Sequence, residues 1–160
     1  MNWIFYKSRL RRTFHRLPTL GVPVAFIMVT MALNISELLF FHFTLPFPRL
    51  TPTSTTLIVP LALGLGAIGM DTSEAVLPVL LTRPLTRSAY VLGHWAALAT
   101  AACFWCLLQL LLEWGLIRIF AFQPLGVDEF VYNAMDRVSL CMGMAAVLVC
   151  FSAQIGRAHV

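Results

Sequence analysis

Four long stretches of the 160-residue chain contain no Asp, Glu, Lys or Arg, and they constrain the fold more than any motif does. They cover residues 17–36, 50–70, 88–112 and 138–156. A helix needs roughly 20 apolar residues to cross the hydrocarbon of a bilayer. Because these stretches lack the alternation of barrel strands, they predict an all-α, polytopic transmembrane helix bundle. The four expected spans, about 20–41, 56–70, 89–112 and 138–154, form one domain over residues 1–154.

Composition excludes the other broad classes. Hydrophobic residues make up 59% of the chain and charged residues 11%, whereas a soluble domain has about 45–50% and 25%. The formal net charge of +4 is explained by membrane topology, so we expect no nucleic-acid partner. The sequence contains no metalloprotease, nucleophile-elbow or phosphate-loop motif. We therefore expect no catalytic residue, no metal and no cofactor bound by this chain, and any driving energy must come from a gradient or another polypeptide.

The first 17 residues combine positive charge with a helical apolar stripe. Five basic residues and no acid lie there, which favours a cytoplasmic N-terminus in a multi-pass protein of the inner (plasma) membrane. The apolar residues recur at helical spacing, so we expect an amphipathic helix in the membrane interface; a plain basic leader is the alternative. The expected interface anchors here and after the second span are Trp3, Tyr6, Arg9, Arg12, Arg16, Tyr90 and Trp95.

Two familiar motifs are better explained by membrane packing. The glycines at 64, 66 and 69 fit a dinucleotide-binding pattern but lie in an expected span, where small residues let helices approach closely. Cys103 and Cys106 fit a redox pattern, yet thiols in lipid behave as small apolar residues. Asn34 and Glu37 are candidates for a polar translocation path. The alternative is that such polar groups, Glu113 included, are solvated span ends or are paired across the bundle.

The stretch between the second and third expected spans carries the functional prediction. Asp71, with Glu74 three residues on, resembles a helix-start capping pair. A short apolar block follows, and Arg83-Pro84 forces an extended or turning backbone before the next helix. This element, residues 71–88, is apolar enough to dock into a partner's groove. The run LLTRPLTRSAYVLG at 80–93 resembles the ABC type-2 permease family, the membrane subunits of ATP-binding cassette exporters. The sequence departs from the family pattern at 75–77, where Gly-Thr-Leu is usual, and at His94, where Lys is common.

The resemblance implies that this chain is a permease subunit that works with a second permease subunit. A separate ATPase subunit would bind ATP and Mg and would contact the coupling segment, residues 71–88. The implied contact residues are Glu74, Leu80, Leu81, Arg83, Pro84 and Arg87.

Two other functions stay open at this point, a secondary transporter or channel and a non-transporting membrane scaffold. The last six residues, 155–160, resemble a translated sequencing-adapter frame. We expect them to be non-native and the chain to be a fragment that lacks two spans of the family core. The segment 114–127 is apolar but contains Arg118, Gln123 and Pro124. The sequence does not decide whether it is an interfacial or a re-entrant piece.

Overall fold

The computed structural model describes residues 6–7, 10–11, 17–40, 50, 52–64, 87–120 and 126–158. The described residues form helices and no strands, which confirms the all-helical prediction. The elements are α2 (Leu17–Phe40), the 3-10 helix η1 (Thr53–Leu57), α5 (Arg87–Phe120) and α6 (Val127–Ala158). Residues 58–64 continue η1 as an α-helix, so that Thr53–Gly64 is one short apolar helix.

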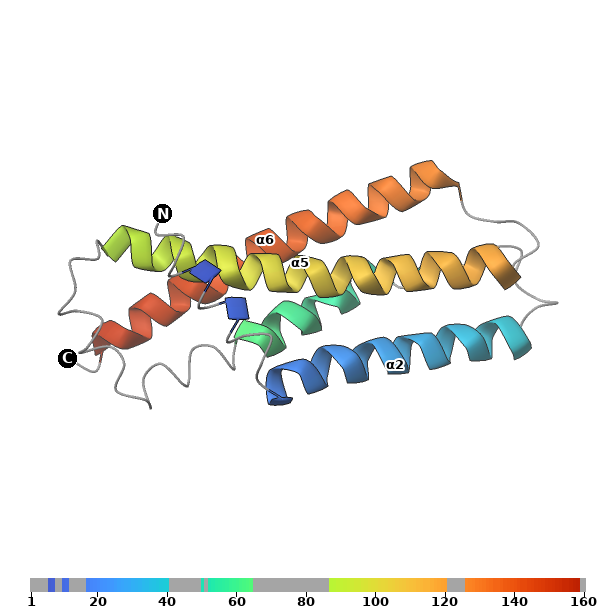
Figure 1. Ribbon diagram of the computed structural model, residues 1–160, viewed down its shortest axis with the longest axis horizontal. Helices are drawn as coiled ribbons and strands as arrows, with labels where there is room; N and C mark the ends of the chain where they lie inside the picture. The colour runs from blue at the N-terminus through green and yellow to red at the C-terminus, as the bar shows by residue number, and fades with distance from the viewer. Residues whose placement is uncertain are drawn as a thin grey trace.

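The three long helices lie along the long axis of the molecule (Figure 1). α2 and α5 run in the same direction, and α6 runs back against α5. The helix Thr53–Gly64 starts near the middle of the molecule and runs antiparallel to α5. α6 is inclined to α5, and the helical segments run lengthwise through the molecule (Figure 1).

Among the described residues, two helices are long and apolar enough to cross a membrane. Their apolar parts are Val91–Ile119 and Val127–Phe151. The apolar helices Leu20–Ser36 and Thr53–Gly64 are shorter, and the remainder of the second expected span lies outside the described residues. The structure thus supports a helical membrane protein with two spans by length and composition, which is less than the four expected.

Both long helices extend beyond the spans expected from charge alone. α5 has 34 residues and is therefore about 51 Å long, against roughly 30 Å of hydrocarbon. It continues to Phe120 and therefore includes the first half of the segment 114–127, whose role the sequence left undecided. α6 begins at Val127, with Asp128 and Glu129 in its first turn, where carboxylates stabilise the helix dipole. Its helix therefore starts well before residue 138, although the charges there suggested a loop.

Small residues form the contact between α5, α6 and the helix Thr53–Gly64. Ala101, Ala102 and Cys106 of α5 are fully buried against this seam, as is Ala145 of α6. A Cβ added to Gly64 would lie 2.5 Å from Leu148 Cδ1. Close approach through small residues, expected for the glycine motif, is confirmed at Gly64; residues 66 and 69 lie outside the described residues.

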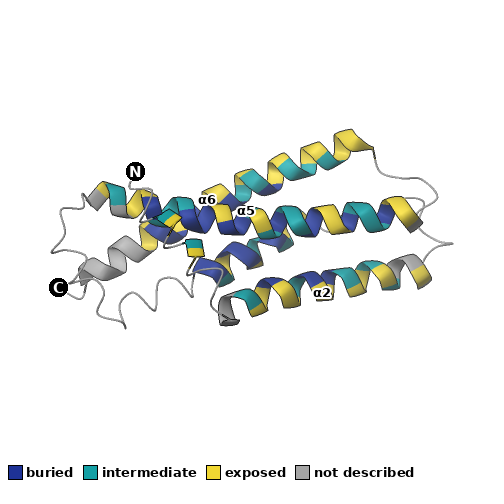
Figure 2. Ribbon diagram, viewed as in Figure 1, coloured by how far each residue is buried: buried dark blue, intermediate teal, exposed yellow. Residues whose placement is uncertain are grey.

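Exposed residues follow the outward faces of the helices (Figure 2), and many of those on α2 are large and apolar. Met28, Leu33 and Leu39 of α2 are 67%, 58% and 75% exposed. Large apolar surfaces of this kind need cover in water. They suit a helix whose outer face lies against lipid.

Candidate functional site: a buried polar cluster

The centre of the candidate site is an ion pair between two helices. Glu113 of α5 and Arg137 of α6 lie 3.1 Å apart, from Oε2 to Nη2, and neither side chain is exposed. A buried charge without a counter-charge is strongly destabilising, so each of these residues requires the other. The sequence left two interpretations of Glu113 open, a solvated span end and a residue paired across the bundle. The structure supports the second.

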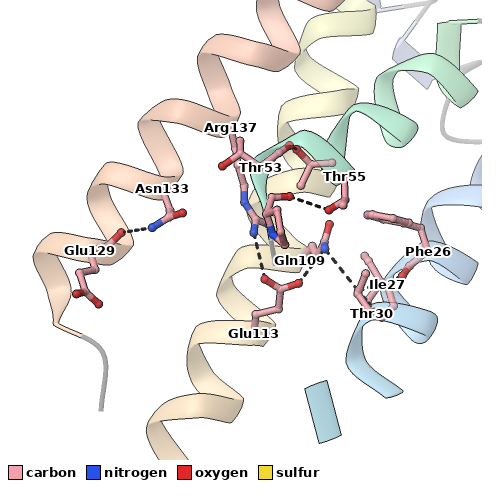
Figure 3. A network of polar contacts seen from close by, with 12 residues as sticks. Phe26, Ile27, Thr30, Thr53, Thr55, Gln109, Glu113, Glu129, Asn133 and Arg137 are labelled. Carbon is pink, nitrogen blue, oxygen red and sulfur yellow. Dashed lines mark hydrogen bonds and ion pairs between the residues drawn. The ribbon is translucent and has the colours of Figure 1, made fainter. Parts of the chain in front are cut away.

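Gln109 connects this ion pair to a third helix. It lies one turn before Glu113 on α5 and is also fully buried. Its Nε2 donates to Glu113 Oε1 at 2.9 Å and to Thr30 Oγ1 of α2 at 3.5 Å. Figure 3 shows Gln109 between Glu113 and Thr30. One amide therefore links α2 to the pair formed by α5 and α6.

The helix Thr53–Gly64 begins beside the same cluster (Figure 3). Its buried Thr56 donates from Oγ1 to Thr53 O at 2.5 Å. The backbone oxygen of Thr56 accepts a long contact of 3.9 Å from Cys106 Sγ, one turn before Gln109 on α5. We call Thr30, Gln109, Glu113 and Arg137, which are connected by hydrogen bonds and the ion pair, the polar cluster.

The polar cluster lies at one border of the uncharged stretches. Glu113 directly follows the stretch 88–112, and Arg137 directly precedes the stretch 138–156. Glu113 is seven residues, or about 10 Å, from the end of α5 at Phe120. The cluster therefore lies inside the bundle but near one end of the uncharged segments, which is cheaper for charges than the bilayer centre.

Aromatic contacts lie between the polar cluster and the nearby helix ends. The rings of Trp114 and Phe130 have centroids 5.2 Å apart, and the guanidinium of Arg118 lies 4.8 Å from the Trp114 ring centroid. Such a cation–π contact contributes about 0.5–1 kcal/mol at an exposed site. This layer joins α5 to α6 beyond the ion pair.

Some sequence-predicted residues fall in the described part of the chain. Tyr6 Oη lies 3.0 Å from Thr100 Oγ1 of α5, and the Trp95 indole donates to Met142 O at 3.2 Å. Both predicted anchors therefore contact the bundle. Asn34 lies one turn beyond Thr30 on α2, and its Nδ2 is buried with no hydrogen-bond partner among the described residues.

The other predicted site residues lie wholly or partly outside the description. Glu37 is in α2, and Arg87 and Tyr90 are in the first turn of α5, but only their backbones are described. Outside the described residues altogether are Trp3, Arg9, Arg12, Arg16, Glu74, Leu80, Leu81, Arg83 and Pro84.

Thr30, Gln109 and Arg137 were not predicted as site residues. A signal exists for Gln109, because an amide four residues before Glu113 places both on one helix face inside an apolar stretch. Arg137 carries no such signal, since its partner lies on another helix.

Among the described residues, the cysteines and the other titratable groups form no second cluster. Cys106 and Cys141 have Sγ atoms 3.3 Å apart and are free thiols. Within the described ranges, no group of three or more His, Cys, Asp or Glu side chains is arranged to hold a metal ion. The chain matches no protein-family model, no curated protein and no solved structure.

Proposed function

We propose that this chain is the membrane-spanning permease subunit of an ATP-driven exporter. It is not an enzyme itself; ATP and Mg bind to a separate ATPase subunit, and a second permease subunit completes the pathway in the inner (plasma) membrane. The support from sequence is the run at 80–93, which resembles the ABC type-2 permease family over its most characteristic segment.

The observation that carries the proposal is the continuity of α5. This helix begins at Arg87, the last contact residue of the coupling segment, and is unbroken to Phe120. It carries Gln109 and Glu113, the latter 26 residues or about 39 Å from Arg87. A movement imposed on the coupling segment by an ATPase subunit would therefore reach the polar cluster through one rigid element.

The strengths of the contacts between the helices indicate which helices separate when the pathway opens. Removing one partner of a buried ion pair costs about 3–5 kcal/mol, so the contact of Glu113 with Arg137 keeps α5 and α6 together. The bond from Gln109 to Thr30 is long at 3.5 Å, and an ordinary neutral hydrogen bond contributes only about 1 kcal/mol. We therefore propose that α2 moves away from α5 and α6, which move as a unit.

A gradient-driven transporter is the second candidate function. The observation that favours it is the buried carboxylate of Glu113, because ionisable groups inside membrane bundles mark ion or proton paths. The ion pair with Arg137 counts against it, since the carboxylate already has a fixed counter-charge. A scaffold role has no comparable observation in its favour.

The experiment that tests the proposal is capture of an ATPase subunit from native membranes. The tagged chain is extracted in mild detergent, bound proteins are labelled with a photoreactive ATP analogue, and labelled peptides are identified by mass spectrometry. We expect a protein with the phosphate-loop motif G-x-x-x-x-G-K-[ST] to be captured by the wild type and lost with Arg83→Glu plus Arg87→Glu.

The control is Arg118→Glu, which makes the same type of substitution, with half the charge change of the double variant, at the opposite end of α5. This variant should capture the ATPase as the wild type does. Capture that survives the double change, or no labelled ATPase with the wild type, would contradict the proposal.

A further inference from the structure

Two buried polar atoms on α2 and α5, which contact each other, have no hydrogen-bond partner among the described residues. One is a donor, Asn34 Nδ2 of α2, and the other is an acceptor, Gln109 Oε1 of α5. The large majority of buried polar side-chain atoms in proteins have a partner. A donor on one helix and an acceptor on the other would satisfy each other if a movement brought the two residues together.

Asn34 continues the face of α2 that packs against α5. The described side chains of α2 that are buried belong to Pro23, Ile27 and Thr30, and separations of four and three residues place them on one helix face. Thr30 is the residue of this face that meets Gln109. Asn34 follows Thr30 by four residues, so it extends the same face by one turn.

The offset between the two unfilled atoms is one helical turn. α2 and α5 run in the same direction (Figure 1), and Thr30 lies opposite Gln109. Asn34 is therefore displaced from Gln109 by about 6 Å along the helix axis. A shift of α2 by one turn toward its own N-terminus would place Asn34 where Thr30 now lies. Because the buried positions of α2 recur at one-turn spacing, the same face would meet α5 before and after this shift.

The contact that such a shift breaks is weak. Gln109 Nε2 lies 3.5 Å from Thr30 Oγ1, at the limit of a hydrogen bond. Thr30 Oγ1 also lies 3.0 Å from Phe26 O and from Ile27 O of its own helix. Its hydroxyl proton therefore keeps an acceptor when Gln109 is lost, and the shift leaves no new unfilled donor on α2.

The contact that the shift forms is stronger. Gln109 Nε2 donates to the Glu113 carboxylate at 2.9 Å, and this bond fixes the amide, since the reversed amide would place oxygen against a carboxylate. Asn carries both donors and an acceptor in one planar amide. Opposite Gln109, Asn34 Nδ2 would donate to Gln109 Oε1 while Asn34 Oδ1 accepts from Gln109 Nε2. Two hydrogen bonds would then replace one, and both unfilled atoms would have partners.

We propose that α2 has two registers against α5, one helical turn apart, and that Asn34 and Gln109 form an amide pair in the second register. Shifts of one element past another by one turn are a known kind of switching transition. The inference rests on the proposed function in one respect, that the shift is the movement of α2 in the transport cycle. The ion pair of Glu113 with Arg137 joins α5 to α6, so α2 shifts against both.

The test measures distances in the full chain in lipid nanodiscs, without any ATPase subunit. Genetically encoded spin labels are placed at Met28 of α2 and at either Leu92 or Ile119 of α5, all of which are exposed. Because Thr30 lies beside Gln109, Met28 is between the other two labels along the axis. The second register therefore shortens the distance from Met28 to Leu92 and lengthens the distance from Met28 to Ile119, each by about 5 Å.

Variants change the balance between the two registers. Thr30→Val removes the contact of the first register and should increase the population with shifted distances about fivefold, as the loss of one neutral hydrogen bond implies. Asn34→Leu, added to Thr30→Val, removes the amide pair and should abolish this increase. Ser36→Ala is the control, because Ser36 donates to Leu33 O of its own helix, and it should change neither distance. Elution profile and thermal unfolding identify any variant that does not fold, and Thr30→Ala replaces Thr30→Val if that variant fails.

Three outcomes would overturn the inference. The first is a pair of distances that Thr30→Val leaves unchanged, and the second is a shifted population that survives Asn34→Leu. The third is an increase in both distances, which means that α2 separates sideways without a change of register; this result leaves the proposed function standing. Because no ATPase subunit is present, the measurement is independent of the capture experiment.

Discussion

Glu113 and Arg137 are 24 positions apart in the sequence, yet their side chains form a fully buried ion pair at 3.1 Å. The pair joins α5 and α6, each of which contains an apolar segment long enough to span a membrane. Glu113 lies in the C-terminal part of α5, far from Arg87 at the start of this helix. In the proposed function, this ion pair keeps α5 and α6 together while α2 moves.

The ion pair predicts strong coupling between its two residues. Arg137→Met leaves a buried carboxylate and should destabilise the protein by about 3–5 kcal/mol. Adding Glu113→Leu should recover most of that loss, because apolar replacements of both partners leave no unmatched charge. The measurement is a double-mutant cycle of unfolding free energies in detergent. Additive effects of the two substitutions would contradict the pairing.

The contact between Thr30 and Gln109 predicts that α2 is held weakly. Thr30→Val keeps the side-chain shape and should cost about 1 kcal/mol of stability, while amide hydrogen exchange increases along α2 and not along α6. Ser36→Ala is the control, since Ser36 donates only within α2, to Leu33 O at 2.8 Å. Equal exchange in the two variants would show that Thr30 does not hold α2.

Gly64 predicts a steric effect with a matched control on α6. Gly64→Val introduces a Cβ within 2.5 Å of Leu148 and should destabilise the protein by about 1–3 kcal/mol. Gly143→Val should have little steric effect, because nothing lies within 4 Å of the added Cβ. Thermal unfolding compares the two, and Leu148→Ala should relieve the effect of Gly64→Val. Similar losses at both glycines would contradict this close packing.

The indole of Trp95 predicts a smaller effect. Trp95→Phe retains an aromatic ring but removes the donor to Met142 O, so we expect a loss of about 1 kcal/mol. Trp105→Phe is a matched change on the same helix, at a ring with an edge-on contact to Phe104. Thermal unfolding should rank Trp95→Phe as the more destabilising; the reverse order would contradict the hydrogen bond.

Much of the fold follows from the uncharged stretches, because a helix is the simplest element that satisfies its backbone in lipid. The start of α6 did not follow from them. Asp128 and Glu129 suggested a loop, whereas carboxylates in a first turn stabilise a helix. The distribution of charged residues therefore locates the uncharged part of a helix, but it does not show where that helix begins and ends.

The polar cluster was only partly predictable for a related reason. Helical spacing places Gln109 and Glu113 on one face, but it does not say which helix that face meets. Arg137 directly precedes an uncharged stretch, and nothing in that position indicates which helix its side chain meets. Only the antiparallel packing of α5 and α6 brings it to Glu113.

The most direct test of the account follows distances at the end of the bundle near Phe120 during an ATP cycle. Genetically encoded spin labels at the exposed positions Leu39, Ile119 and Tyr132, which are 75%, 76% and 74% exposed, report on α2, α5 and α6. The chain is reconstituted with its captured ATPase subunit and measured with and without trapped nucleotide. The account predicts that the distance from Leu39 to Ile119 increases while that from Ile119 to Tyr132 stays constant. Distances that do not respond to nucleotide, or separation of α5 from α6, would contradict it.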